Sequence, residues 1–413
     1  MKNKHILFAA YGAGHINMLL PVIKYFRQHK EYNVTVLAFT TAGFTLTNNE
    51  VDYLSYKDFT HLFDSSKIFE FGDLLSENMK TSCIVPEDET IAYLGINFLE
   101  LTQLHGFDAS VELYNKKGRS CFYPIQSMKR ILTFLCPDIV VSTHAPRSER
   151  ALIGAAGQLS IPSVCLVDLF PFRAYEWLAE NGYANKVCVL SEYVKKFLVS
   201  KGRSVNDIVV TGNTVFDKLS FYRSTKRKQN SPTTSKNSKT ILWASQVEPH
   251  IHPLQTELTG NPDLPRDIEY YLYSILKKHP GWKLIIRPHP SENHNYVNLP
   301  DNVKISQKTE KIHELISTVD VVITMTSTVA IEAALIGKPV ITVDLSIFTK
   351  DSPFSEMGLT RGVKRISDLE TAIIDAEPST NMMNSVDKIV GKPGGATKNI
   401  IRVIEELLIE TSL

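Results

Sequence analysis

Short apolar runs with the character of buried strands alternate with segments of helical period along most of this chain. The first such run is followed by Ile16–Gln28, whose apolar residues recur at helical spacing. This alternation is typical of a parallel sheet covered by helices on both faces, because each crossover returns the chain to the same edge of the sheet. The strand-like runs of the first half are His5–Ala10, Val34–Phe39, Ile139–Ser142, Ser163–Val167, Val187–Leu190 and Ile208–Val210.

The alternation stops near the middle of the chain and then starts again, which predicts two α/β domains. The stretch from Arg223 to Lys239 has no aliphatic or aromatic residue and cannot bury a core, so it is interpreted as a linker or exposed basic loop. Strand-like runs resume at Thr240–Ala244, Trp282–Ile286, Val321–Thr324 and Val340–Val343. We expect Rossmann-like domains over residues 1–218 and 240–395, a linker over 219–239 and a C-terminal helix over 396–413. Residues 52–119 alternate poorly and are predicted to form helices or loops on the rim of the first domain.

The charge balance argues against a nucleic-acid partner. The sequence holds 45 Lys and Arg against 44 Asp and Glu, a net charge of +1, which creates no strong field for DNA, RNA or an anionic membrane.

The apolar run before Tyr11 is too short for a signal peptide. We therefore expect a cytoplasmic protein, with peripheral contact at the inner face of a membrane left open. Five cysteines without metal-ligand spacing predict no metal site.

A glycine-containing turn follows the first strand and opens the first helix. Gly12 and Gly14 would let the backbone approach a ligand, and the helix N-terminus offers N–H groups to anions. Asn17 stands where a dinucleotide fingerprint needs its third glycine, which disfavours NAD. His15 lies at the carboxyl end of a strand, where open α/β sheets bind ligands. It is interpreted as a general base or a ligand hydrogen-bonder, and a helix-capping histidine is the simpler alternative.

Two loops of the second half predict a site for a nucleotide phosphate. One follows the strand Trp282–Ile286 and carries a guanidinium and an imidazole, held in a loop that two prolines make rigid. The other places three hydroxyl residues at a helix N-terminus, where hydroxyls and backbone N–H groups can cradle phosphate. A glutamate one turn further could accept hydrogen bonds from ribose hydroxyls. The predicted donor site comprises Arg287, His289, Thr326, Ser327, Thr328 and Glu332.

These motifs together resemble the GT-B glycosyltransferase superfamily. The resemblance rests on the Gly-Ala-Gly-His turn, on Val210–Thr214, on Arg287–Pro290 and on Thr326–Thr328 with Glu332–Pro339. It implies two Rossmann-like domains facing each other across a cleft, with the nucleotide sugar on the C-terminal domain and the acceptor and base on the N-terminal one. It also implies that the C-terminal helix returns to the first domain. Gly212 and Asn213 would then lie at the cleft.

Within this superfamily the chain looks like bacterial capsule and surface-polysaccharide transferases that use CMP-sugars or CDP-glycerol. The implied reaction moves a sugar from a nucleotide donor to a saccharide or lipid-linked acceptor without a cofactor or metal, and a CMP-sugar is favoured over a UDP-sugar. Such a transfer needs a base for the acceptor hydroxyl and donors for the departing phosphate. We rank His15 and Asp168 first as the base, followed by Glu176 and His144.

Two alternatives stay open. Residues Gly212–Asp217 are equally similar to the non-hydrolysing UDP-GlcNAc 2-epimerases, although the Gly-Thr-Arg-Pro-Glu first turn of those enzymes is absent here. A sugar-nucleotide epimerase, which needs no acceptor, is therefore the alternative enzyme. A two-domain sugar-binding protein without catalysis is the other alternative, because domain closure serves binding as well as catalysis.

Overall fold

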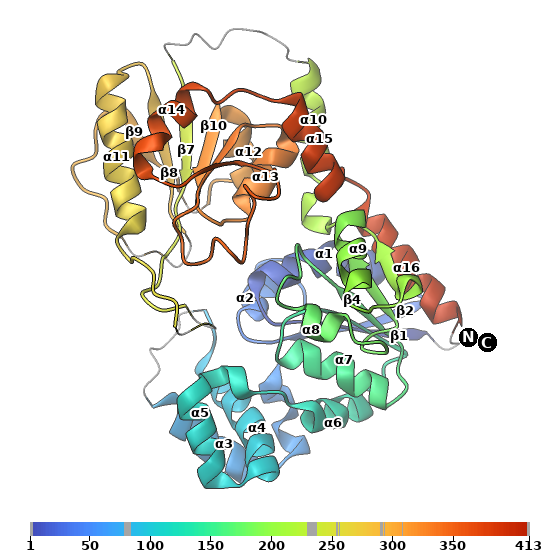
Figure 1. Ribbon diagram of the computed structural model, residues 1–413. Helices are drawn as coiled ribbons and strands as arrows, with labels where there is room; N and C mark the ends of the chain where they lie inside the picture. The colour runs from blue at the N-terminus through green and yellow to red at the C-terminus, as the bar shows by residue number, and fades with distance from the viewer. Residues whose placement is uncertain are drawn as a thin grey trace. The chain divides into compact units, whose positions relative to one another are not determined.

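A computed structural model describes residues 3–77, 84–228, 238–252, 255, 257–289, 292, 294–307 and 309–410. The chain divides into two compact units (Figure 1). Unit 1 comprises Met1–Val215 with Gly395–Leu413, and unit 2 comprises Phe216–Gly394. Each unit is built on a parallel six-stranded sheet with interleaved helices. The predicted α/β class with two Rossmann-like domains is thereby confirmed.

The sheet of unit 1 has the order β2-β1-β3-β4-β5-β6. The chain passes from β1 to β2 on one side and later adds β3 on the other side of β1, which creates a switch point between β1 and β3. Open α/β sheets bind ligands in the crevice at the carboxyl ends of the strands at such a point. The strands are β1 Lys4–Ala10, β2 Tyr32–Ala38, β3 Ile139–Thr143, β4 Ser163–Leu166, β5 Lys186–Val189 and β6 Ile208–Val210.

Helices cover this sheet and share its core. The C-terminal helix α16 buries Ile400, Ile404 and Leu407 in the same apolar cluster as Phe8 and Val22, so it is part of unit 1. Its position beside the other elements of this unit can be followed in Figure 1. The helices around the sheet are α1 Ala13–Gln28, α2 Ala42–Thr47, α7 Ser148–Gln158, α8 Tyr175–Leu178, α9 Glu192–Ser200 and α16 Ala396–Glu410.

The described residues between β2 and β3 are mostly helical, in agreement with the predicted helices or loops. Helices α3 and α4 cross at a pair of glycines: a Cβ at Gly72 would lie 2.4 Å from the carbonyl oxygen of Ile91, and one at Gly95 would lie 2.0 Å from that of Ile68. Only glycine permits so close a crossing. The helices here are α3 Ser65–Ser76, α4 Glu87–His105, α5 Phe107–Lys117 and α6 Ile125–Leu135, preceded by the 3₁₀ turn η1 Tyr56–Leu62.

The sheet of unit 2 has the order β12-β11-β10-β7-β8-β9, with its own switch point between β7 and β10. Its edge strands β9 and β12 are short and partly exposed, and the sequence did not predict them. The strands are β7 Thr240–Ala244, β8 Lys283–Arg287, β9 Val303–Ile305, β10 Val321–Thr324, β11 Val340–Val343 and β12 Arg361–Val363. The α-helices in the described part of this unit are α10 Leu219–Lys228, α11 Leu264–Lys278, α12 Ile312–Thr318, α13 Val329–Ile336, α14 Leu369–Ile374 and α15 Thr380–Ile389.

The predicted linker over 219–239 is wrong for its first ten residues, which form helix α10. Leu219 is fully buried, and Arg223 donates two hydrogen bonds, of 2.6 and 2.8 Å, to the carboxylate of Asp387 in α15. A polar composition rules out a core of its own, but one buried leucine and a bidentate ion pair suffice to hold a helix against a neighbour. Residues 229–237 lie outside the described part of the chain.

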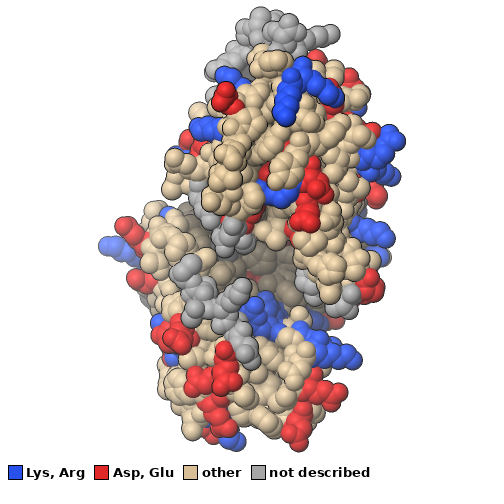
Figure 2. Space-filling model, turned by 90° about the vertical axis from the view of Figure 1, so that its left-hand side faces the viewer, with Lys and Arg blue, Asp and Glu red and all other residues tan. Residues whose placement is uncertain are grey.

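The surface carries both signs of charge. Figure 2 shows Lys and Arg interspersed with Asp and Glu on the face it presents, in keeping with the net charge of +1. None of the described helices is long and apolar enough to cross a bilayer.

Candidate active site

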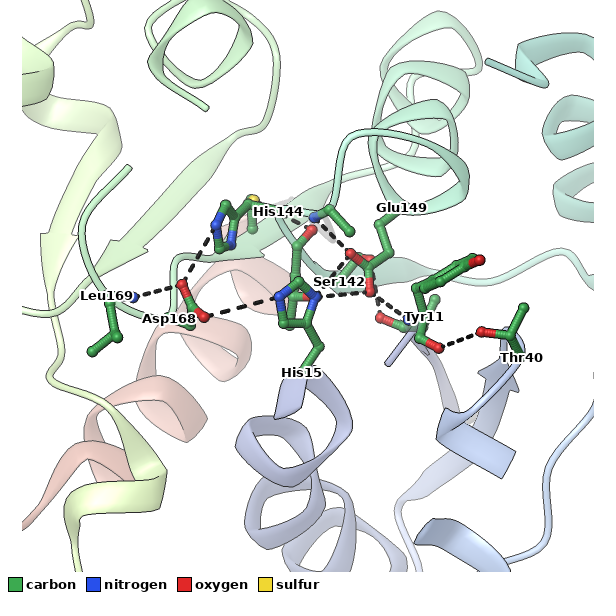
Figure 3. Close-up of polar contacts among 12 residues, drawn as sticks. Tyr11, His15, Thr40, Ser142, His144, Glu149, Asp168 and Leu169 are labelled. Carbon is green, nitrogen blue, oxygen red and sulfur yellow. Dashed lines mark hydrogen bonds and ion pairs between the residues drawn. The ribbon is translucent and has the colours of Figure 1, made fainter. Parts of the chain in front are cut away.

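Two histidines and two carboxylates meet at the carboxyl edge of the unit 1 sheet (Figure 3). His15 stands in the first turn of α1, directly after β1, and His144 follows β3. Glu149 lies in the first turn of α7, and Asp168 follows β4. The strands β1, β3 and β4 are neighbours, and the carboxyl ends of parallel strands share one edge. Residues distant in sequence therefore converge at the switch point.

Glu149 is the centre of this cluster. Its side chain is completely buried, and its two oxygens accept hydrogen bonds of 2.6 Å from the backbone N–H groups of Tyr11 and Ala145. The same carboxylate lies 3.3–3.4 Å from Nδ1 of His15. Since an ionised carboxylate only accepts, Nδ1 of His15 is the protonated nitrogen toward Glu149. The hydroxyl of Thr143 lies 2.8 Å from the same Nδ1.

Asp168 faces both imidazoles from the other side. Its Oδ1 lies 3.4 Å from Nε2 of His144, and its Oδ2 lies 3.9 Å from Nε2 of His15. The side-chain amide of Asn213 donates a 2.7 Å hydrogen bond to the backbone carbonyl of Asp168. Gly212, beside it, has a φ of +83°, and a Cβ there would lie 3.2 Å from Cβ of Ala396 in α16. The turn after β6 thus supports the position of Asp168.

The environments drive the pKa values of the two histidines apart. Burial acts to lower the pKa of His15, but the charges of Glu149 and Asp168 and the hydrogen bond to Glu149 outweigh it and raise the pKa to about 9. Burial lowers the pKa of His144, assisted by the positive charge of His15 and opposed by Asp168. Burial also opposes the ionisation of Glu149, yet His15 and the hydrogen bonds prevail, and its pKa is lowered. At neutral pH His15 therefore carries a proton that it can donate, and His144 is neutral.

The remaining predicted residues of unit 1 are less central. A Cβ at Gly12 would meet only the hydroxyl oxygen of Thr41, at 3.9 Å, and one at Gly14 would meet no atom within 4 Å. The turn is therefore open, as a ligand-approach site would be. Glu176 is exposed on α8, and within the described residues no hydrogen bond or ion pair joins it to His15 or Asp168. It lies outside the cluster.

Unit 2 brings the hydroxyl loop and the start of α13 together. Gln246, after β7, holds this loop: it accepts a 2.6 Å hydrogen bond from the backbone N–H of Thr326 and donates one of 3.3 Å to its hydroxyl. The Ser327 hydroxyl accepts from the N–H of Val329, and Thr328 is exposed at the helix N-terminus. Polar groups thus surround the positive end of the helix dipole.

Two predicted ligands in unit 2 already have protein partners. Glu332 Oε2 lies 2.6 Å from Nε2 of His313, so one of its two carboxylate oxygens already has a partner within the protein. Arg287 donates to the hydroxyl of Ser306, at 2.8 Å, and to the carbonyl of Gln307, so its guanidinium turns toward β9. In the sheet, β9 lies on one side of β8, and β7 and β10 lie on the other side. Arg287 therefore points away from the hydroxyl loop.

His289 is held by a network that the sequence did not reveal. Its backbone N–H donates to Glu292 Oε2 at 3.1 Å, and the other oxygen of Glu292 accepts from Arg266 and, at 3.2 Å, from the hydroxyl of Tyr296. Burial lowers the pKa of His289, so its ring is neutral at neutral pH. Pro290, the last residue of this motif, lies outside the described residues.

A cavity adjoins the unit 1 cluster. It has a volume of about 780 Å³ and is lined by side chains from the turn after β1, from α3 and α4, and by Arg147 just before α7.

Sequence reasoning missed both Glu149 and Arg147. The only local signal is their position after a buried strand, with Arg147 in the loop and Glu149 in the first turn of the helix. An acidic residue in a first turn is usually explained by the helix dipole. Among the described residues no group of three or more His, Cys, Asp or Glu is arranged to hold a metal ion.

Residues 181–404 match the family model described as UDP-N-acetylglucosamine 2-epimerase. This match covers more than half of the chain. No curated protein resembles the sequence closely enough to count as a match.

Solved structures resemble the whole chain. The UDP complex of MnaA from S. aureus has 14% identity and a TM-score of 0.57, covering 98% of this chain and 97% of the other. The UDP-GlcNAc 2-epimerase of Neisseria meningitidis bound to UDP-GlcNAc has 17% identity and a TM-score of 0.55, covering 98% and 100%. MurG of Acinetobacter baumannii has 15% identity and a TM-score of 0.55, covering 98% and 99%. At such identities the likeness establishes the fold, two Rossmann-like domains of the GT-B type.

Proposed function

The chain belongs to the UDP-N-acetylglucosamine 2-epimerase family, and we propose that it is an enzyme that inverts the C2 centre of a nucleotide sugar. The family match over residues 181–404 carries this proposal. Epimerases among the structural neighbours support it, and one of them is described as bound to UDP-GlcNAc. The comparisons favour a uridine nucleotide and lend no support to the cytidine donor expected from the sequence.

The cluster around His15 suits this chemistry. Inversion at a C–H centre requires one group to remove a proton and another to deliver one from the opposite face. His15, whose pKa is raised to about 9, carries a proton at neutral pH. Asp168 lies within 4 Å of His15 and His144, and the neutral His144 is a candidate acceptor. When the surroundings of two neighbouring groups make their pKa values differ, one group can act as the acid and the other as the base.

Unit 2 would hold the nucleotide. We place the diphosphate at the N-terminus of α13, where Ser327 and Thr328 flank the first backbone N–H groups, with His289 as an additional donor. The ribose would face Oε1 of Glu332. Arg287 is turned toward β9 and takes no direct part in this placement.

The function is tested by incubating the protein with UDP-GlcNAc without any acceptor. Epimerisation should produce UDP-ManNAc, or UDP with free ManNAc if water intervenes, both visible by NMR spectroscopy. A thermal-shift panel of CMP, CDP, UMP, UDP and GDP should give the largest stabilisation with UDP, since a ligand raises the melting temperature of the state that binds it. Stabilisation by CMP alone would restore the cytidine donor.

Glycosyl transfer is the second candidate. The Gly-Ala-Gly-His turn ends in His15, and the cavity beside it has room for a saccharide or lipid-linked acceptor. In this case UDP would be released only when an acceptor is added, and no ManNAc would form. The acceptor-free incubation therefore separates the two reactions.

We expect kcat/KM to fall as the pH rises through about 9, because His15 loses its proton there. On the acidic side the rate should fall below pH 6.5, where His144, whose pKa is lowered, becomes protonated. In Glu149→Gln the alkaline limb should move to lower pH, since the carboxylate that raises the pKa of His15 is gone. A wild-type profile that stays flat from pH 7 to 10 would contradict the assigned role of His15.

Replacement His289→Ala should weaken UDP binding by about 10- to 100-fold, the usual loss when one hydrogen bond to a charged group is removed. The matched control is His279→Ala. Its ring stacks on Trp282 at a centroid distance of 4.1 Å, before the start of β8, whereas His289 follows the end of that strand. Both variants are measured by isothermal titration calorimetry. Equal UDP affinity in wild type and His289→Ala would remove His289 from the nucleotide site.

A further inference from the structure

The cavity of unit 1 has the properties of a small-molecule site. Its volume of about 780 Å³ lies within the usual range for ligand pockets. Apolar side chains, including Val85 and Ile91, line it together with hydroxyl, acidic and basic groups. The described residues that line it all belong to unit 1.

Arg147, one of two arginines among the described lining residues of this cavity, is placed to bind an anion. Its guanidinium is half-buried and lies 4.4 Å from the centroid of the Tyr11 ring. In the part of the chain that the structure describes, no carboxylate forms an ion pair with it. A half-buried arginine held against an aromatic ring is well placed to bind a carboxylate or phosphate.

The platform beneath Arg147 is rigid. The backbone N–H of Tyr11 donates to Glu149 at 2.6 Å, and its carbonyl accepts a 3.0 Å hydrogen bond from the hydroxyl of Thr40. The Tyr11 ring meets the edge of Tyr93, which is 1% exposed, at a centroid distance of 5.9 Å. Arg147 is thereby positioned beside the His15 cluster. Because its side chain is already held in place, binding of an anion would cost little conformational entropy.

We propose that this cavity binds an anionic sugar whose phosphate or carboxylate pairs with Arg147. The carboxylates of Asp73, Glu77 and Glu87 also line it, and they are suited to accept hydrogen bonds from sugar hydroxyls. The inference goes beyond the proposed epimerisation, which needs no second sugar, and it uses unit 1 alone. If the reaction is transfer, the anionic sugar is the acceptor.

The test is calorimetric titration of the full chain with glucose 1-phosphate, glucuronate and glucose in saturating UDP, which keeps sugar anions out of the nucleotide site. At least one of the two anionic sugars should bind about 10-fold more tightly than glucose or better. Comparing glucose 1-phosphate with glucuronate shows whether the cavity prefers a phosphate or a carboxylate. Arg147→Gln should weaken that binding by about 10- to 100-fold. Arg147→Lys should retain part of it, because the charge remains but the planar fork is lost.

The matched control is Arg130→Gln. Arg130 also lies over an aromatic ring, 5.5 Å from the centroid of Phe63, but it does not line the cavity, and the variant should bind like wild type. Wild-type protein that binds glucose as tightly as the anions, or that binds none of the three, would overturn the proposal. Binding of the anionic sugar that is seen without UDP but is lost in saturating UDP would overturn it as a separate site. The comparison of the Arg147 and Arg130 variants does not use the epimerase assay, so failure of that assay would not decide this proposal.

Discussion

Replacing His15 by glutamine is expected to lower the turnover rate by about 10²- to 10⁴-fold, the range usual for loss of a general acid or base. Glutamine can still donate a hydrogen bond to Glu149 but has no proton to transfer. Nucleotide affinity should change little, since the placed nucleotide contacts belong to unit 2. The rates are measured with saturating UDP-GlcNAc, and affinity for UDP is measured by calorimetry.

The matched control for this variant lies just after the end of the same helix. His29 follows α1 and its Nδ1 lies 2.8 Å from the carbonyl of Tyr25, without contact to the cluster. His29→Gln should retain wild-type turnover. A His15→Gln enzyme with more than half of the wild-type rate would exclude His15 from proton transfer, whichever reaction the enzyme performs.

Removing the Glu149 carboxylate should have the largest effect on stability. In Glu149→Ala two backbone N–H groups lose their acceptor and the His15 imidazolium loses its buried counter-ion. Breaking a buried pair by deleting one partner costs about 3–5 kcal/mol. We expect a loss of this size in the free energy of unfolding of unit 1, measured by urea denaturation and circular dichroism at pH 6.

The pH dependence identifies the cause of that loss. A raised His15 pKa contributes stability that is complete below pH 6.5 and disappears as the pH rises through about 9. The lowered pKa of Glu149 contributes stability that is present above pH 4.5 and is lost as the pH falls. The difference between wild type and Glu149→Ala should therefore be largest between pH 4.5 and 6.5.

A second buried glutamate provides the comparison. Glu100 accepts hydrogen bonds from the backbone N–H groups of Gln126 and Ser127, but no histidine faces it in the described residues. Glu100→Ala should destabilise the protein without removing the decline in stability between pH 6.5 and 9. If Glu149→Ala kept that same decline, the pairing of Glu149 with His15 would not be its source.

The interior strands of both sheets could be predicted because they are buried on both faces. The run predicted at His5–Ala10 is β1, Lys4–Ala10, and the run predicted at Thr240–Ala244 is β7 with the same bounds. The edge strands β9 and β12 lack such a run because one side of each faces solvent, and they were missed. Helix α10 was missed for a related reason, since its stability comes from a contact with α15 and not from its own composition.

The sequence by itself determined the fold class and the side chains that stand at strand ends, because strand burial and helical period are local properties of a chain. It therefore pointed to His15, His144 and Asp168. Only the tertiary structure decided that Glu149 pairs with His15, since this depends on β3 lying next to β1 although β2 follows β1 in the chain. The opposite pKa shifts of the two histidines arise from burial and from charges brought together by that strand order, and no local pattern encodes either.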